Sequence, residues 1–235
     1  MAKYVDPSFD FYTDTPTGRD PDSFSPTLRR YHKYIWSKPL PTGAALKLSD
    51  EVPGAYLCHQ SNGAELVLSS DALGHTYRYV KAMAPVIEQV PERDLDRFFK
   101  LCSTIGAYTL FPARKIDGKM TINGARGFSS KLRDRFDLTL ECIRRHYASQ
   151  PSPLSDVLAR YSDFFALFGS FSGYVDFFLF QDLTDGTENA VKFWLPFDDF
   201  NSSPLPKSVC DYDTYKSNVT TFIHARNRRI SATDQ

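Results

Sequence analysis

The chain has 235 residues, of which 42% are hydrophobic, 24% charged and 14% aromatic. This composition excludes a disordered or low-complexity protein, and a chain of this length can bury a core without disulfides or a structural metal. Lys plus Arg and Asp plus Glu number 28 each, so the formal net charge is zero. We therefore expect no bulk binding of nucleic acid, because the molecule as a whole does not attract a polyanion.

The start of the chain is acidic and lacks the apolar stretch of a secretory signal. No window approaches the roughly 18 consecutive apolar residues of a membrane span, so we expect a cytoplasmic protein with no membrane contact. The four cysteines form no CxxC pair and no zinc-knuckle spacing with a histidine; they are Cys58, Cys102, Cys142 and Cys210. We expect these thiols to be reduced, and we expect no metal and no cofactor.

The first 47 residues are rich in proline, which removes backbone donors and favours irregular structure. Within them, Ser25 can cap a helix and Pro26 suits its first position, so a short helix is predicted over residues 26–36. The segment also carries many aromatic residues. A free tail would leave these exposed, so we expect residues 1–47 to pack on the rest of the domain.

The middle of the chain is predicted to form strands. The β-prone runs are Ala55–Gln60, Glu65–Ser70, Ala107–Pro112 and Met120–Asn123. Between the first two, the dipeptide Asn62-Gly63 favours positive φ and predicts a hairpin. Between the second and third, Pro91–Thr104 is predicted to be a helix, with acidic residues near its start.

From Ser129 onward the apolar residues recur every three or four positions, which predicts a helix capped by Ser129 or Ser130. Another helical run extends from Ser152 to Gly169. Gly173–Leu183 could be a buried strand or a buried helix, and we favour the helix. Val191–Leu195 is predicted to be a strand and Asp213–Ile230 a final helix. Since strands precede Asn123 and helices dominate after it, we expect an α+β fold: one domain, residues 1–235, whose small, mainly antiparallel sheet is covered by C-terminal helices.

A resemblance to a known family rests on two long blocks, FDFYTDTPTGRDPDSFSPTLRRYHKYIWSKPLPTG at residues 9–43 and TINGARGFSSKLRDRFDLTLECIRRHY at residues 121–147. With the shorter GYVDFFLFQDL and HARNRRI, they resemble a family of uncharacterised bacterial proteins that is classed only as a domain of unknown function. The resemblance extends from about residue 6 to about residue 230. It implies a bacterial or phage-related intracellular protein with one family-wide domain, and it implies no catalytic residue, cofactor or substrate.

One candidate binding site is the segment Asn123–Gly127, expected to be a loop before the helix. There Asn123, Arg126, backbone donors and the helix dipole could meet a phosphate or carboxylate; the alternative is a simple turn with glycines at positive φ. Arg30 and Lys38 come from a basic, aromatic-rich stretch and could also line such a pocket, although a solvated helix face explains them equally simply. The nucleotide-binding patterns GxxxxGK[ST] and GxGxxG are absent.

The candidate catalytic residues are Glu141 and His32. Glu141 lies among apolar residues, and partial burial would raise its pKa toward acid–base work; the alternative is an ordinary ion-pair ladder along the helix. Asp20 and Asp22 belong to an acidic segment that could hold a cation, but we expect turns in which the carboxylates bond their own backbone. Arg226, near the buried stripe of the last helix, is predicted to pair with a core acid such as Asp176 or Glu141.

Two functions from different classes are consistent with these patterns. The protein could bind an anionic, phosphate-bearing small molecule or act on a nucleotide. Alternatively, it could be a non-catalytic protein-interaction subunit in a bacterial or phage-related assembly, with aromatic residues at the partner surface. A concave pocket lined by Arg126 and another basic residue would favour the first, and a flat exposed aromatic patch the second.

Overall fold

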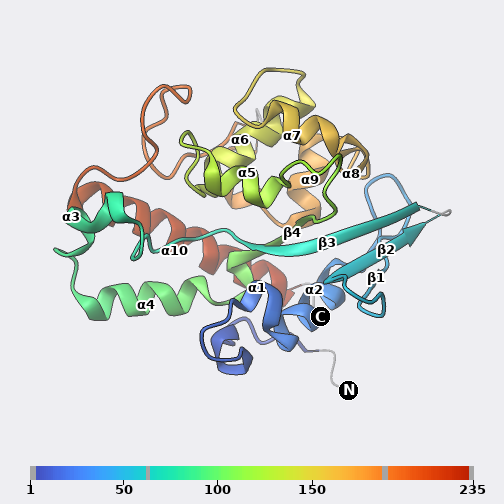
Figure 1. The fold of residues 1–235 in the computed structure, drawn as a ribbon, viewed down its shortest axis with the longest axis horizontal. Coiled ribbons are helices and arrows are strands. Elements are labelled where there is room, and N and C mark those ends of the chain that lie inside the picture. The colour runs from blue at the N-terminus through green and yellow to red at the C-terminus, as the bar shows by residue number, and fades with distance from the viewer. Residues whose placement is uncertain (1–3, 62–63, 187–189, 233–235) are drawn as a thin grey trace.

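A four-stranded antiparallel sheet lies at the centre of the computed structural model, which describes residues 4–61, 64–186 and 190–232 (Figure 1). The strands lie side by side in chain order: β1 (Leu48–Ser49), β2 (Leu57–Ser61), β3 (Ala64–Ala72) and β4 (Tyr108–Pro112). The predicted hairpin of β2 and β3 is confirmed, and its Asn62-Gly63 turn lies outside the described residues.

The strand register leaves part of β3 without a partner on one side. β2 begins at Leu57, which pairs with Leu68, and β3 continues to Ala72. On its other side, β3 pairs with β4 as far as Ala72 and Tyr108. Residues 69–72 of β3 therefore have one open edge, and the candidate site described below lies there.

Ten α-helices occur in the described residues: α1 (Pro21–Phe24), α2 (Pro26–Trp36), α3 (Ala84–Ile87), α4 (Glu92–Cys102), α5 (Ile122–Phe128), α6 (Phe136–Tyr147), α7 (Ser155–Arg160), α8 (Ser162–Ala166), α9 (Phe171–Phe178) and α10 (Val209–Ala232). Short 3-10 helices are η1 (Phe11–Asp14), η2 (Lys81–Met83), η3 (Ile105–Ala107) and η4 (Gln181–Leu183). Figure 1 shows α5 to α9 on one side of the sheet and α1 and α2 on the other. The predicted α+β fold with helices from the C-terminal half against the sheet is confirmed.

The start of α2 is capped as the sequence predicts. Ser25 accepts a hydrogen bond from the backbone N–H of Leu28 at 3.0 Å, and Pro26 occupies the first position. The Ser25 hydroxyl also donates to Asp14 at 2.6 Å, which joins η1 to the start of the helix. This second contact fixes the segment that carries Asp20 and Asp22.

Two predicted strands and one helix start are wrong. Residues 120–123 are not a strand, because Thr121 caps α5 and accepts from Gly124 N–H at 3.5 Å, so Asn123–Gly127 lies inside a helix rather than in a loop. Of Val191–Leu195, only Val191 forms a bridge, to Thr184. The helix expected from Ser129 begins at Phe136, because Arg133 and Asp134 adopt positive φ values of 47° and 60° and turn the chain first. Gly173–Leu183 is helical, as favoured, but in two pieces: α9 ends at Phe178, Leu179 turns the chain at φ 59°, and η4 follows.

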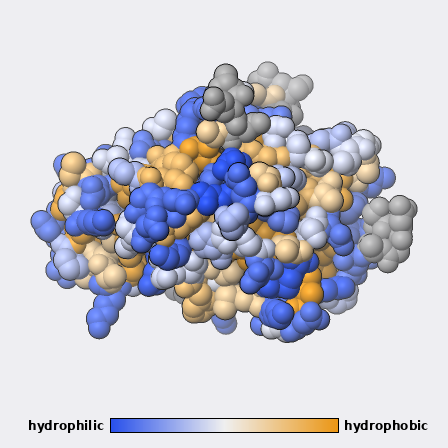
Figure 2. All heavy atoms as spheres, turned by 90° about the horizontal axis from the view of Figure 1, so that it is seen from above, coloured by the Kyte–Doolittle hydropathy of each residue, from blue (hydrophilic) through white to orange (hydrophobic). Residues whose placement is uncertain are grey.

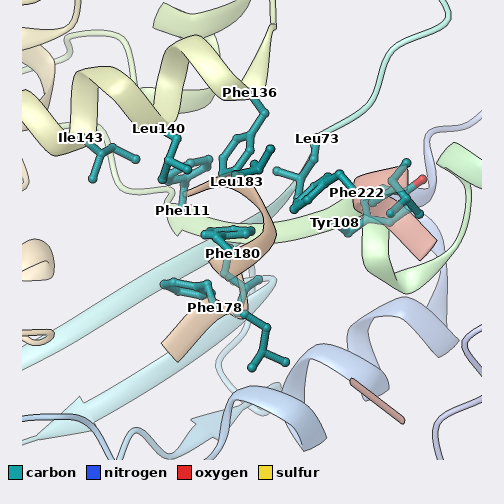
Figure 3. Close-up of a cluster of buried hydrophobic side chains, with 14 of the residues drawn as sticks. Leu73, Tyr108, Phe111, Phe136, Leu140, Ile143, Phe178, Phe180, Leu183 and Phe222 are labelled. Atoms are coloured by element: carbon teal, nitrogen blue, oxygen red, sulfur yellow. The ribbon is translucent and has the colours of Figure 1, made fainter. Parts of the chain in front are cut away.

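The core is continuous from the N-terminal segment to α10. Val5, Phe11 and Trp36 are at most 1% exposed and join the same cluster of buried apolar residues as Ile230. Figure 3 shows side chains of α6 meeting those of β4 and of the segment after α9; the rings of Phe136 and Phe180 are 4.8 Å apart. The proline-rich segment is thus part of the core, which places its acidic residues firmly beside the sheet.

Candidate functional site

A cavity of about 520 Å³ lies at the open edge of β3. Its walls come from η1, α1, the end of β3, residues 74–76, the C-terminal part of α4, the first residue of β4, α5 and the turn before α6. The polar side chains with carboxyl, imidazole or amide groups in this lining are Asp20, Asp22, Asp71, His75, Asn123 and Asp134. The cavity thus joins segments that are more than 100 residues apart in the sequence.

The cavity is acidic. Four aspartates line it, and none of the described lining residues is Lys or Arg. Burial lowers the pKa of His75, which favours its neutral form. A cation, or a neutral molecule with many hydroxyl groups, suits such a lining better than an anion does.

Asp22 has the most perturbed carboxyl group in the cavity. Burial, followed by the nearby charge of Asp71, raises its pKa well above the usual value. Its carboxyl group accepts a hydrogen bond from the Ser70 hydroxyl at 3.0 Å, which opposes that rise only in part. Asp22 is therefore the group best suited to carry a proton near neutral pH.

A chain of hydrogen bonds leads from the core to Asp22. The indole N–H of Trp36 donates to Nδ1 of His32 at 3.0 Å, and because indole can only donate, the proton of the neutral imidazole is on Nε2. This Nε2–H lies 3.0 Å from Oγ of Ser70, whose own hydroxyl donates to Asp22. All donors thus point toward the carboxyl group and orient it.

The same hydrogen bonds argue against a hydrolase triad. Serine, histidine and aspartate are the residue types of such a triad, but a triad histidine accepts the serine proton through Nε2. Here Nε2 carries a proton and the serine donates to the aspartate. His32, which is fully buried and does not line the cavity, positions Ser70 and Asp22 instead of acting as a base.

Asp71 is held by the buried Arg126. The guanidinium of Arg126 forms an ion pair with Asp71 and donates to Thr139 Oγ1 at 3.0 Å and to Asp134 O at 3.2 Å. Burial raises the pKa of Asp71, but the adjacent Arg126 opposes this rise, and a fully buried guanidinium requires a carboxylate partner. Arg126 therefore favours the ionised form of Asp71, while burial and the charge of Asp71 favour the protonated form of Asp22.

Two buried polar atoms at the cavity have no hydrogen-bond partner among the described residues. They are Nε2 of His75 and Oδ1 of Asn123. The amide nitrogen of Asn123 donates to Ser69 Oγ at 3.2 Å and to Ser70 O at 3.1 Å, which fixes the amide at the edge of β3. Since buried polar atoms are rarely left unsatisfied, these two are the natural contacts for a bound molecule or water.

The residues predicted from the sequence are not brought together. Asn123 lines the cavity, and Arg126 lies behind it. Glu141 is bound by Arg144 at 2.8 Å and by Arg145 at 2.7 Å, so it belongs to an ion-pair cluster. The ammonium group of Lys38 donates to Phe177 O at 2.7 Å, and burial lowers the pKa of Lys38 to about 8. The predicted anion pocket is therefore not formed by these residues.

Arg30, also predicted to line an anion pocket, lies outside the cavity. It is exposed on α2, with its guanidinium 5.4 Å from the ring of Tyr31. The spacing of α2 turns Tyr31 and Ile35 inward and leaves the basic residues between them on other faces. A basic run on an amphipathic helix thus spreads its charges instead of concentrating them.

The sequence reasoning missed Asp71, His75 and Asp134, and it treated Asp20 and Asp22 as turn residues. Asp20 does cap α1, accepting from the Asp22 N–H at 3.1 Å. The available signal was the polar run Ser69-Ser70-Asp71 directly after the apolar start of a strand. Polar residues at the end of a buried strand are a common location for a site.

The described residues contain no group of three or more His, Cys, Asp or Glu side chains placed to hold a metal ion. All four cysteines are free, and three of them are buried. No helix in the described ranges has both the length and the apolarity needed to cross a membrane.

The sequence matches one protein family over residues 5–230, and the description of that family is Family of unknown function (DUF6994). The chain belongs to this family. The resemblance found in the sequence is confirmed, and every residue that lines the cavity lies inside the DUF6994 match. No curated protein and no solved structure matches the chain. The bacterial origin and cytoplasmic location stay predictions.

The buried His32 leads to a testable pH dependence. Burial, followed by the charge of Arg226, lowers its pKa from 6.5 to about 3. Below pH 6.5 the unfolded chain binds a proton that the folded chain does not, so the free energy of unfolding falls toward pH 3 by about 1.4 kcal/mol per unit. In urea titrations, we expect the loss between pH 6.5 and 4.5 to be about 2 to 3 kcal/mol smaller in His32→Gln than in the native protein.

The matched control is His224→Gln, because His224 is exposed on α10. This variant should retain the native pH dependence. An identical pH dependence in all three proteins would show that His32 is not held neutral in the fold.

Proposed function

We propose that this protein is a hydrolase that cleaves a glycosidic bond in a small molecule, with Asp22 as the proton donor. The observation that supports this most is the acidic cavity, in which burial strongly raises the pKa of one carboxyl group, Asp22, while its neighbour Asp71 forms an ion pair with a buried arginine. Two carboxyl groups whose environments favour opposite protonation states are typical of a general acid and its charged companion.

The chemistry of glycosidic bonds explains why carboxylates suit it. When such a bond breaks, the sugar carbon and ring oxygen develop positive charge, and fixed negative charges nearby lower the energy of that transition state. Asp71 is paired with the guanidinium of Arg126, which favours its ionised form, and Asp20 and Asp134 add further carboxylates to the lining. An anionic group in this cavity would instead be repelled, which is why we do not propose that the anion predicted from the sequence binds here.

The remaining walls of the cavity suit a sugar or an aromatic leaving group. Tyr12, Phe99, Tyr108 and Phe128 line it, and the rings of Tyr12 and Phe99 are 4.8 Å apart. Pockets for small molecules commonly combine such apolar walls with a few placed polar groups. Here the placed groups are the aspartates together with the unpartnered atoms of His75 and Asn123.

The reaction then has three proton movements. Asp22 gives its proton to the leaving oxygen or nitrogen as the bond to the sugar carbon breaks. Water adds to that carbon, and an ionised carboxylate of the cavity takes the proton that the water releases. Return of this proton to Asp22 restores the starting state, so hydrolysis is balanced without another reactant.

The test compares Asp22→Asn with the native protein. Nitrophenyl glycosides and nucleosides are offered as substrates, and release of nitrophenol or free base is followed. On any substrate that the native protein cleaves, we expect Asp22→Asn to reduce the rate at least about 100-fold, because an amide cannot supply the proton. The matched control is Asp163→Asn, at an exposed position on α8 outside the cavity, which should keep the native rate.

Two results would contradict the proposal. One is an unchanged rate in Asp22→Asn. The other is a native protein that neither cleaves nor binds any member of the panel, with binding followed by the change in melting temperature.

The alternative of a non-catalytic interaction subunit has weaker support. The two most exposed aromatic side chains, Tyr79 at 90% and Phe128 at 80%, lie beside cavities rather than on a separate flat patch. Figure 2, the view from the side of α5 to α9, shows hydrophilic residues interspersed among hydrophobic ones. An interaction role stays a prediction, and the rates of the Asp22→Asn variant help to distinguish it from catalysis.

A further inference from the structure

A second cavity, of about 270 Å³, adjoins the acidic one. The two share His75, Thr76, Gly127 and Asp134 in their linings. The second cavity is lined in addition by Arg78, Tyr79 and Arg133, among others. The two cavities therefore lie side by side, and the wall that they share includes a glycine.

The boundary is formed by a tight turn. Arg133 and Asp134 both have positive φ, 47° and 60°, and the hydroxyl of Tyr77 donates to Arg133 O at 3.1 Å. Asp134 lines both cavities, whereas Arg133 lines only the second. At Gly127, an added Cβ would lie 3.2 Å from Asp134 Oδ2, so a side chain there would press against Asp134 in the shared wall.

The second cavity differs from the first in charge. Arg133 is exposed and lines this cavity, and no ion pair or hydrogen bond of its side chain is found among the described residues. Arg78, in contrast, forms ion pairs with Glu92 and with Asp96, the latter at 3.0 Å. A ligand that spans both cavities thus meets several carboxylates at one end and, beside Asp134, the unpaired guanidinium of Arg133 at the other.

We propose that the substrate is a phosphorylated glycoside, whose sugar lies in the acidic cavity and whose phosphate binds Arg133 in the second cavity. This inference rests on the proposed glycosidic reaction. Guanidinium groups bind phosphate through paired, charge-assisted hydrogen bonds, so a phosphate directs the substrate into one orientation. The exposed ring of Tyr79 at the rim offers a surface for an aromatic base. Nucleotides and sugar phosphates share this chemistry.

The experiment measures binding of matched pairs by calorimetry: adenosine and adenosine 5′-monophosphate, ribose and ribose 5-phosphate, glucose and glucose 6-phosphate. In the native protein, we expect the phosphorylated member of at least one pair to bind about tenfold or more tightly, and this preference should weaken as salt is added. Which pair shows it distinguishes a nucleotide from a simple sugar phosphate. Arg133→Gln should abolish the preference.

The matched control is Arg228→Gln, which makes the same change in charge at an exposed position on α10. It should keep the native preference for the phosphorylated member. Equal affinity within every pair, or an unchanged preference in Arg133→Gln, would overturn the phosphate site while leaving the proposed reaction intact. Binding of no member of any pair would overturn both.

Discussion

Replacing Arg126 with methionine is expected to lower the free energy of unfolding by about 3 to 5 kcal/mol, as removal of one partner of a buried ion pair generally does. Arg126 is fully buried, and its partner Asp71 is 16% exposed. Without the guanidinium, the Asp71 carboxylate stays buried with no opposite charge beside it. The contacts of Arg126 to Thr139 and Asp134 are lost as well, so α5 is less firmly attached to the turn before α6 and to α6 itself.

The free energy of unfolding lost in Arg126→Met should also depend on pH. With Arg126 absent, the pKa of Asp71 in the folded protein rises further, so the folded protein binds a proton that the unfolded chain releases. The stability difference between Arg126→Met and the native protein should therefore be smaller at pH 5 than at pH 8. Urea titrations at both values measure it.

Two further variants distinguish the effect of breaking the buried ion pair from the effect of losing a large arginine side chain. The double variant Arg126→Met with Asp71→Leu removes both charges and should regain a large part of the lost stability. Arg114→Met removes an arginine whose side chain is 62% exposed in its pair with Glu65, and it should cost less than about 1 kcal/mol. A double variant as unstable as Arg126→Met would mean that the side chain matters through packing rather than through charge.

The second large effect is expected at Arg226, the residue predicted to pair with a core acid. Its burial is confirmed, at 0% exposure, but the acid partner is wrong. The guanidinium donates to three backbone carbonyls, those of Phe178 at 3.0 Å, Gly106 at 2.9 Å and Tyr108 at 2.7 Å. Phe178 is the last residue of α9, where carbonyls lack helical partners and the helix dipole favours a cation.

Arg226→Ala should lower the free energy of unfolding by about 3 kcal/mol or more, because it leaves a void and three buried acceptors without their donor. The carbonyls belong to α9, η3 and β4, so their attachment to α10 is weakened together. Chemical denaturation followed by tryptophan fluorescence measures this loss, since Trp36 lies 5.5 Å from the guanidinium.

Arg229→Ala is the control for this variant on the same helix. Arg229 pairs with Asp182 at 2.7 Å and its side chain is 43% exposed, so its removal should cost less than about 1 kcal/mol. Equal, small losses at both positions would show that the burial of Arg226 contributes little to the stability of the fold.

Several elements of the fold were predictable from the sequence because their causes are local. Ser25 and Pro26 specify the start of α2, and the apolar period of residues 213–230 predicts most of α10. The β2–β3 hairpin follows from two β-prone runs on either side of a turn dipeptide. Each of these rests on propensity, capping or periodicity within about twenty residues, and the α+β class follows from the order in which such local patterns occur along the chain.

The predictions that failed depended on tertiary contacts. Residues 120–123 have β propensity, but Thr121 can cap, and α5 gains the contact of Asn123 to the edge of β3. The start of α6 moves to Phe136 because Tyr77, distant in the sequence, holds the turn at Arg133. The positions of acidic residues in the sequence did not predict the partners of Arg226, because its acceptors are backbone carbonyls, which every residue possesses.

By itself, the sequence determined the composition of a globular core, the class of the fold, the family and the individual helices that carry strong caps. Only the tertiary structure decided where the site lies. Asp22, Asp71 and Asp134 come from three separate segments, and although Asp22 and Asp134 lie in the two blocks that carry the family resemblance, no catalytic pattern marks any of the three. They meet because β2 begins opposite Leu68 and leaves the edge of β3 open between α1 and α5. A strand register is a pairing of distant backbone segments, and local residue patterns do not specify which edge such a pairing leaves uncovered.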